Sequence, residues 1–107
     1  MKGIWIIVKR LPFGSNALTL FPFVFYKKKA DCQELRTHEI IHLYQQMEML
    51  VFPFYIWYLI EWCYRRYQGR TWMDAYRNIS FEQEAYTYDY LSDYIQIREM
   101  YFWKKFL

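Results

Sequence analysis

The sequence predicts an α+β fold, with a short antiparallel β-hairpin followed by three to four helices in a single domain that covers residues 1–107. Two β-branched and aromatic runs near the start are typical of strands. Three helix-start signals follow them. A chain of 107 residues has the length of one domain, and no repeat or flexible linker divides it.

The two strands are expected at residues 3–9 and 17–27, and they form the predicted hairpin. Pro22 lies inside the second strand and has no backbone N–H to donate to a neighbouring strand. This strand is therefore expected at an edge of the sheet or with a bulge at Pro22. An extended peptide could add to such an edge, and we expect this around residues 18–25.

The first helix is expected to begin at about Cys32, because Asp31 and Glu34 have the spacing of a capping box. Helical periodicity divides its residues between two faces. The apolar face is expected to contain Ile40, Tyr44, Met47 and Val51. The other face contains His38, His42, Gln45 and Met49.

Pro53 is expected to end or kink the first helix, and an apolar second helix then runs to about Tyr67, before Gly69. Two more capping boxes predict the remaining helices. They are Thr71 with Asp74, and Ser80 with Gln83, the second opening a helix that runs to about Lys104.

The first helix contains the string His38-Glu39-Ile40-Ile41-His42, which includes both histidines of the chain. Residues four apart lie almost one above the other on a helix, so both imidazoles face the same way. Two ring nitrogens so placed can occupy two corners of a zinc tetrahedron, and Glu39 can reach a water held on the metal. The string therefore predicts a zinc site.

Zinc needs at least one more protein ligand, and no third histidine exists. Glu82 is the preferred candidate, because Ala85 is one turn away and lets its helix approach the motif helix closely. Glu61 is the second candidate, since a carboxylate in an apolar stretch needs a partner. Asp89 continues the face of Glu82 and could orient a histidine by accepting its second ring proton.

The pair of motifs, His38-Glu39-x-x-His42 and Glu82-x-x-Ala85, resembles the gluzincin zinc metallopeptidases whose third ligand comes from an E-x-x-A helix. Residues 35–89 also resemble small, uncharacterised bacterial zincin-like proteins. The resemblance implies a minimal zincin-like fold, a zinc cofactor held by His38, His42 and Glu82, and Glu39 as general base. One membrane-linked group with this E-x-x-A helix is the CAAX-protease-like metallopeptidases, which usually have aspartate directly after the alanine. This chain has Tyr86 at that position.

Many gluzincins also carry a His, Tyr or Arg that stabilises the oxyanion. Tyr86, Tyr90 and Arg77 remain open for this role, because nothing in the sequence separates them. The predicted function is hydrolysis of peptide bonds through a water on the zinc. The alternative is a non-catalytic zincin-like binding module.

Composition limits the partners and the compartment. The net charge is +3, and no basic stripe alternates with aromatics, so a nucleic-acid partner is not expected. Basic clusters and an aromatic content of 24% are compatible with a membrane surface. The apolar, charge-free run of residues 49–60 is shorter than a spanning helix of about 20 residues. We expect a cytoplasmic protein, with a membrane-peripheral location as the alternative.

Overall fold

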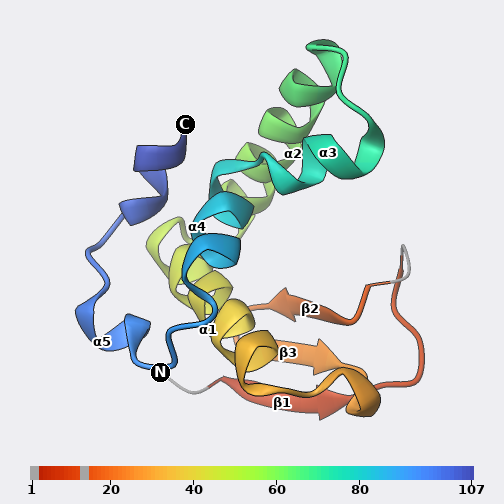
Figure 1. The fold of residues 1–107 in the computed structure, drawn as a ribbon, viewed down its shortest axis with the longest axis vertical. Helices are drawn as coiled ribbons and strands as arrows, with labels where there is room; N and C mark the ends of the chain where they lie inside the picture. Colours follow the sequence, from red (N-terminus) through yellow and green to blue (C-terminus); the bar gives the residue numbers. More distant parts are fainter. Residues whose placement is uncertain (1–2, 13–14) are drawn as a thin grey trace.

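The computed structural model describes residues 3–12 and 15–107, and it places a small sheet beside a group of helices (Figure 1). The strands are β1 (Ile4–Ile7), β2 (Ala17–Leu20) and β3 (Phe23–Tyr26). The α-helices are α1 (Gln33–Glu48), α2 (Phe52–Tyr67), α3 (Trp72–Arg77), α4 (Ser80–Tyr88) and α5 (Tyr94–Ile97). Two 3-10 helices are η2 (Lys28–Ala30) and η3 (Phe102–Phe106). The α+β class is confirmed.

The sheet has three strands in the order β1-β3-β2, and it is mixed. Strand β1 runs parallel to β3, while β2 runs antiparallel to β3. The expected hairpin between residues 3–9 and 17–27 is therefore wrong in its pairing. The second run forms two strands that reverse at Phe21 and Pro22, because Pro22 cannot continue a ladder of backbone hydrogen bonds.

Only β2 offers an open edge within the stretch 18–25, because β3 is paired on both sides. The hydrogen bond from the Lys27 amide to the Asn16 carbonyl (3.0 Å) sets the alternation along β2. The backbone groups of Ala17 and Thr19 therefore point away from β3. The Thr19 carbonyl already accepts hydrogen bonds from Gln46 and from the Tyr55 hydroxyl.

Helix α1 begins close to the expected residue, but with a different cap. The Sγ atom of Cys32 accepts the hydrogen bond from the Leu35 amide (3.4 Å). The expected cap, Asp31, instead pairs with Arg36 at 2.8 Å. The last turn ends before Leu50 and Val51, which have positive φ, and α2 then starts with Pro53 in its first turn.

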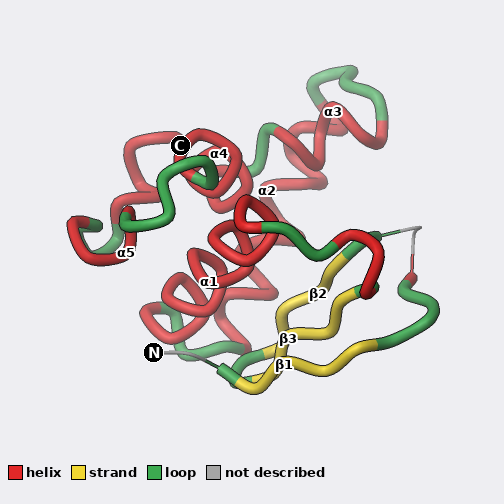
Figure 2. The backbone as a smooth tube through the Cα atoms, turned by 60° about the horizontal axis from the view of Figure 1, so that its bottom comes forward, coloured by secondary structure: helices red, strands yellow, loops and turns green. Residues whose placement is uncertain are grey.

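The buried face of α1 is mostly polar, and this differs from the expected apolar stripe. Ile41 and Leu43 are fully buried, whereas Met47 of the expected stripe is exposed. The polar residues buried on this helix are Thr37, His38, Glu39, His42, Gln45 and Gln46. Helix α1 lies between the sheet and α4 (Figure 2), so its polar side chains are buried against both.

The helices after α2 follow the expected signals in part. Thr71 caps α3 as expected, by accepting from the Asp74 amide at 3.2 Å. Ser80 is the first residue of α4 and not its cap. The expected long helix to Lys104 ends at Tyr88, and α5 and η3 follow as separate short helices.

Two apolar clusters support this arrangement. The larger one joins α2, α4 and η3 through Phe54, Ile79, Phe81 and Trp103. The smaller one joins α1, α4 and α5 through Ile41, Ala85 and Tyr94. Within residues 3–12 and 15–107, no helix has the length and apolar character needed to cross a bilayer.

Candidate metal centre

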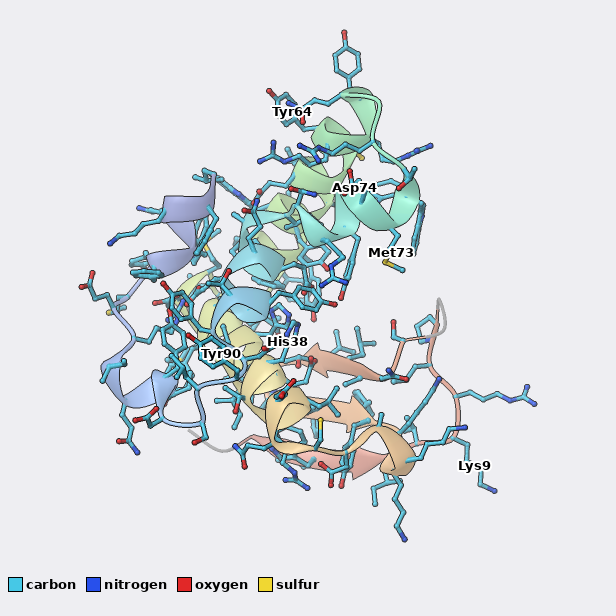
Figure 3. The ribbon with its side chains drawn as sticks, in the orientation of Figure 1. Lys9, His38, Tyr64, Met73, Asp74 and Tyr90 are labelled. Atoms are coloured by element: carbon cyan, nitrogen blue, oxygen red, sulfur yellow. The ribbon has the colours of Figure 1, made fainter. Side chains whose placement is uncertain are left out.

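Both histidines lie on the side of α1 that faces α4, and their ring centroids are 4.8 Å apart. Nε2 of His38 lies 3.1 Å, and Nε2 of His42 lies 3.2 Å, from the same oxygen, Oε1 of Glu82. Donor atoms from two helices therefore meet at one buried point near His38, which is labelled in Figure 3. Candidate ligand atoms of His38, Glu39 and His42 also lie within 4.8 Å of one another.

Helix α4 is held by α2 at its start and packs against α1 farther along. Glu61, the second candidate ligand, accepts hydrogen bonds from the amide (2.9 Å) and the hydroxyl (2.5 Å) of Ser80. It therefore anchors the start of α4 and lies outside the cluster. Ala85 is fully buried against Ile41 of α1, where its small side chain permits the close approach that brings in Glu82.

The second ring nitrogen of each histidine also has a partner. Nδ1 of His38 lies 3.1 Å from a carboxylate oxygen of Asp89, the residue that ends α4. Nδ1 of His42 lies 2.8 Å from the amide oxygen of Gln45. The Gln45 amide nitrogen donates to the Phe81 carbonyl and to Glu84, both at 3.0 Å, so its oxygen is the end that faces His42.

These contacts place an acceptor at all four ring nitrogens, whereas a neutral imidazole can donate from only one of its two. Protons alone would satisfy the acceptors only if His38 and His42 were both imidazolium, side by side in a buried site. A single divalent cation between the two Nε2 atoms and Glu82 removes this conflict. Each Nδ1–H then stays on its acceptor, which is the usual arrangement around histidine ligands.

The charges in the cluster are strongly coupled. Burial lowers the pKa of His38, but hydrogen bonds to Asp89 and Glu82 outweigh it and raise the pKa to about 10. Burial likewise lowers the pKa of His42, and the charge of Glu82 raises it above its ordinary value. Burial raises the pKa of Glu82, while His42 and His38 hold it well below the ordinary range. Glu82 is therefore an ionised carboxylate that attracts a cation.

Two of the distances between candidate donor atoms are compatible with zinc. Neighbouring ligands of a zinc tetrahedron with bonds of about 2.0 Å lie about 3.3 Å apart. The distances from the two Nε2 atoms to the Glu82 oxygen are 3.1 and 3.2 Å. Two imidazoles and one carboxylate are also a donor set that zinc prefers over magnesium or calcium.

Glu39 lies beside the cluster without bridging the two histidines. Its Oε2 is 4.0 Å from Nε2 of His38, and its Oε1 accepts a hydrogen bond of 2.8 Å from the Thr19 hydroxyl. The Thr19 contact fixes the carboxylate at the buried end of an open cavity of about 310 Å³. Glu39 and His38 both line this cavity, so a group bound there can reach them.

Tyr76 and Tyr86 also line the cavity, and Tyr86 packs on His38 with ring centroids 4.5 Å apart. Burial raises the pKa of both hydroxyls, and the hydrogen bond between them raises that of Tyr76 and lowers that of Tyr86. Arg77 lies 4.2 Å over the Tyr86 ring, and Tyr90 does not line the cavity.

Some residues of the site were not evident from the sequence. Tyr58 of α2 donates to Oε2 of Glu82 at 2.7 Å, and Thr19 comes from the sheet. Nothing in their spacing connects them with the motif helix. Gln45 did carry a signal, because it shares the helix face of His38 and His42.

Comparison with protein-family models, with curated proteins and with solved structures finds no match for this chain.

Proposed function

We propose that this chain is a zinc-dependent metallopeptidase. One observation carries the proposal: both histidine Nε2 atoms approach a single oxygen of Glu82 while each Nδ1 is held by an acceptor. This pattern of hydrogen bonds is suited to a divalent cation. The resemblance of the two motifs to gluzincins supports the same function.

His38, His42 and Glu82 would hold the metal. Zinc bound there supplies a Lewis acid that polarises a peptide carbonyl and lowers the pKa of a coordinated water towards 7. Asp89 and Gln45 keep the two imidazoles in the tautomer that leaves Nε2 unprotonated. Tyr58 restrains the second oxygen of Glu82 and so fixes the plane of the carboxylate.

Glu39 is the general base in this proposal. It lines the cavity and lies next to His38, so its carboxylate can accept a proton from an attacking water. The hydrogen bond from Thr19 orients it and leaves Oε2 for this proton. The same carboxyl group then protonates the nitrogen of the leaving amine, which completes hydrolysis of the peptide bond.

Tyr86 is our choice for the group that stabilises the oxyanion. Its ring packs against His38, and the residue lines the cavity beside Glu39. A neutral hydroxyl can donate to the carbonyl oxygen as negative charge develops on it. Arg77 acts through the Tyr86 ring and not directly, because its guanidinium is stacked on that ring.

A peptide substrate would bind along β2, which borders the cavity at Ala17. The outward-facing backbone groups available there are those of Ala17 and the amide of Thr19, because the Thr19 carbonyl is occupied. This permits only a short strand addition near the start of β2. The proposal therefore favours extended peptides that are anchored mainly by side chains in the cavity.

The decisive experiment combines zinc stoichiometry with hydrolysis of a peptide library. The parent should bind one zinc ion and cleave peptides, Glu39→Gln should keep the zinc and lose turnover, and Glu82→Gln should lose zinc. Glu34→Gln is the matched control, since Glu34 is exposed at the cavity rim. Parent protein that binds zinc but cleaves no peptide would favour the alternative, a non-catalytic binding module. Equal turnover in Glu39→Gln would overturn the proposed mechanism.

A further inference from the structure

Helix α2 has two faces with opposite roles. Its inward face packs Phe54 in the larger cluster and directs the Tyr55 and Tyr58 hydroxyls to Thr19 and Glu82. Its outward face contains exposed, mostly bulky residues at helical spacing. These are Phe52, Ile56, Leu59, Ile60, Cys63, Tyr64 and Tyr67. Their positions repeat every three to four residues, so they form one continuous stripe, called here the α2 outer face.

The α2 outer face is unusually apolar for a surface in water. Phe52 is 80% exposed, and Ile56 and Ile60 are each 62% exposed. A helix in water normally turns its apolar stripe inwards and its polar residues outwards. A contiguous exposed stripe of this kind marks a binding surface. The far end of α2 projects away from the sheet, and the labelled Tyr64 lies there (Figure 3).

The charged groups around this face are mostly basic. Arg65, Arg66 and Arg70 follow the apolar stripe at the end of α2. Trp103 of η3 packs against Trp57 of α2, with ring centroids 5.6 Å apart. The two acidic residues in this part of α2 and α3 are already bound. Glu61 is buried on Ser80, and Asp74 pairs with Arg70.

We propose that the α2 outer face docks on an anionic membrane surface, with α2 lying in the plane of the interface. The apolar stripe would enter the boundary of headgroups and acyl chains, as amphipathic interfacial helices do. The aromatic rings of Trp57, Tyr64 and Tyr67 suit the headgroup level. Arg65 and Arg66 would meet the acidic lipids, each contributing attraction near the surface.

A second copy of the chain explains this surface less well. Packing two α2 outer faces together would bury the apolar stripe, but it would give the arginines at the end of α2 no acidic partner on that helix. No free acidic side chain on the described part of α2 is available to pair with them. An anionic lipid surface satisfies the apolar stripe and the cations together. This inference does not depend on the metal or on peptidase activity.

Co-sedimentation with lipid vesicles tests the proposal. The full chain should bind vesicles that contain phosphatidylglycerol, bind pure phosphatidylcholine vesicles more weakly, and lose affinity as salt is added. Ile56→Ser combined with Ile60→Ser should reduce binding by roughly tenfold or more, because both side chains would leave the apolar layer. Arg66→Gln should reduce binding about fivefold. Circular dichroism should show the parent helix content in each variant.

The matched control is Ile97→Ser in α5, where the side chain is 70% exposed but lies outside the α2 outer face. It should bind as the parent does. Loss of binding in Ile97→Ser equal to that in the Ile56 and Ile60 variant would overturn the proposal, as would no binding of the parent to phosphatidylglycerol vesicles. A lipid-free dimer that Ile60→Ser disrupts would assign this face to self-association instead.

Discussion

Helix α4 contains two buried carboxylates, Glu82 and Glu84, which are two residues apart. They point to different sides of the helix and have different hydrogen-bond partners. Glu84 accepts hydrogen bonds from Arg98 (2.5 and 3.1 Å), Tyr94 (2.7 Å) and Gln45 (3.0 Å). Arg98 is always charged, so Glu84 has a permanent counterion. Glu82 instead faces two imidazoles and a tyrosine, of which none is a permanent cation.

This difference separates a structural carboxylate from one that can exchange its counterion. A buried carboxylate is costly unless a cation compensates it. At Glu84 the compensating cation is covalently part of the chain, so the region is stable but cannot bind anything else. At Glu82 the positive charge is carried by protons on the imidazoles, and under the proposed function a metal ion would replace them. The same helix therefore combines a fixed ion pair with a site of exchangeable charge.

The largest expected effect comes from removing the fixed cation. Arg98→Ala leaves Glu84 and Glu48 buried and unpaired, since Arg98 also binds both Glu48 oxygens at 2.9 and 3.0 Å. We expect a loss of about 3–5 kcal/mol in the free energy of unfolding, measured by urea denaturation. Arg98→Lys keeps the charge but not the fork of donors and should lose less. Equal stability of Arg98→Ala and the parent would contradict the role given to Glu84.

Asp89→Asn should weaken the exchangeable site without unfolding it. The asparagine oxygen can still accept from Nδ1 of His38, but the negative charge that supports the ligand is gone. We expect zinc affinity to fall about tenfold or more, measured by competition with a chelating dye. Asp93→Asn is the control, because its side chain is exposed and does not cap α5. The two variants should have similar melting temperatures once zinc is removed.

The pH dependence of the free energy of unfolding should distinguish the cations beside Glu82 from the cation beside Glu84. In metal-free protein the pKa of His38 is raised to about 10, above its unfolded value of about 6.5. Its contribution to stability is therefore fully present below pH 6.5 and is lost as pH rises towards 10. Burial lowers the pKa of Arg98, but hydrogen bonds to Glu84 and Glu48 raise it above an already high value, so Arg98 stays charged and adds no slope in this window.

Zinc should reverse that trend, because it binds the unprotonated Nε2 atoms and must displace protons from His38 and His42. We expect zinc affinity to rise between pH 6 and pH 9, while the metal-free protein loses stability. Thermal unfolding with zinc and with a chelator over this range measures both trends. Parallel pH profiles in the two conditions would contradict metal binding through the histidines.

The smallest effect is expected at an exposed ion pair. Arg36 binds both oxygens of Asp31 at 2.8 and 2.9 Å, in a geometry like that of Arg98, but both side chains are partly in solvent. Arg36→Ala should lower the free energy of unfolding far less than Arg98→Ala does, because solvent screens the exposed pair. The same urea denaturation experiment can include it beside Arg98→Ala. If Arg36→Ala lowers the free energy of unfolding as much as Arg98→Ala does, burial does not explain the difference expected between Arg36 and Arg98.

The sequence indicated the parts of the site that depend on local spacing. His38 and His42 face the same way because they are four apart on a helix, and Ala85 pointed to Glu82 because small residues permit close helix packing. Tyr58, Tyr76 and Thr19 were not predicted as site residues, since each comes from a different element. Their positions depend on how α2, α3 and β2 pack, which no local pattern encodes.

The same limit explains the errors in the fold. The expected helix from residue 80 to 104 breaks at Asp89, whose side chain binds His38 of another helix. Strand β1 pairs in parallel with β3, and this needs a connection that spacing alone does not reveal. Helix starts with a local cap, such as Thr71, were predicted correctly because the signal and the structure involve the same few residues.

The link from His42 through Gln45 and Glu84 to Arg98 has a consequence for how the protein is made. The two histidines leave the ribosome about forty residues before Glu82, and Arg98 follows later still. Without Arg98, docking α4 against α1 would bury the Glu84 carboxylate without a counterion. Docking of this helix, which also carries Glu82, is then unfavourable. We therefore expect a chain truncated before residue 98 to capture zinc poorly, because Glu82 would not be held beside the histidines.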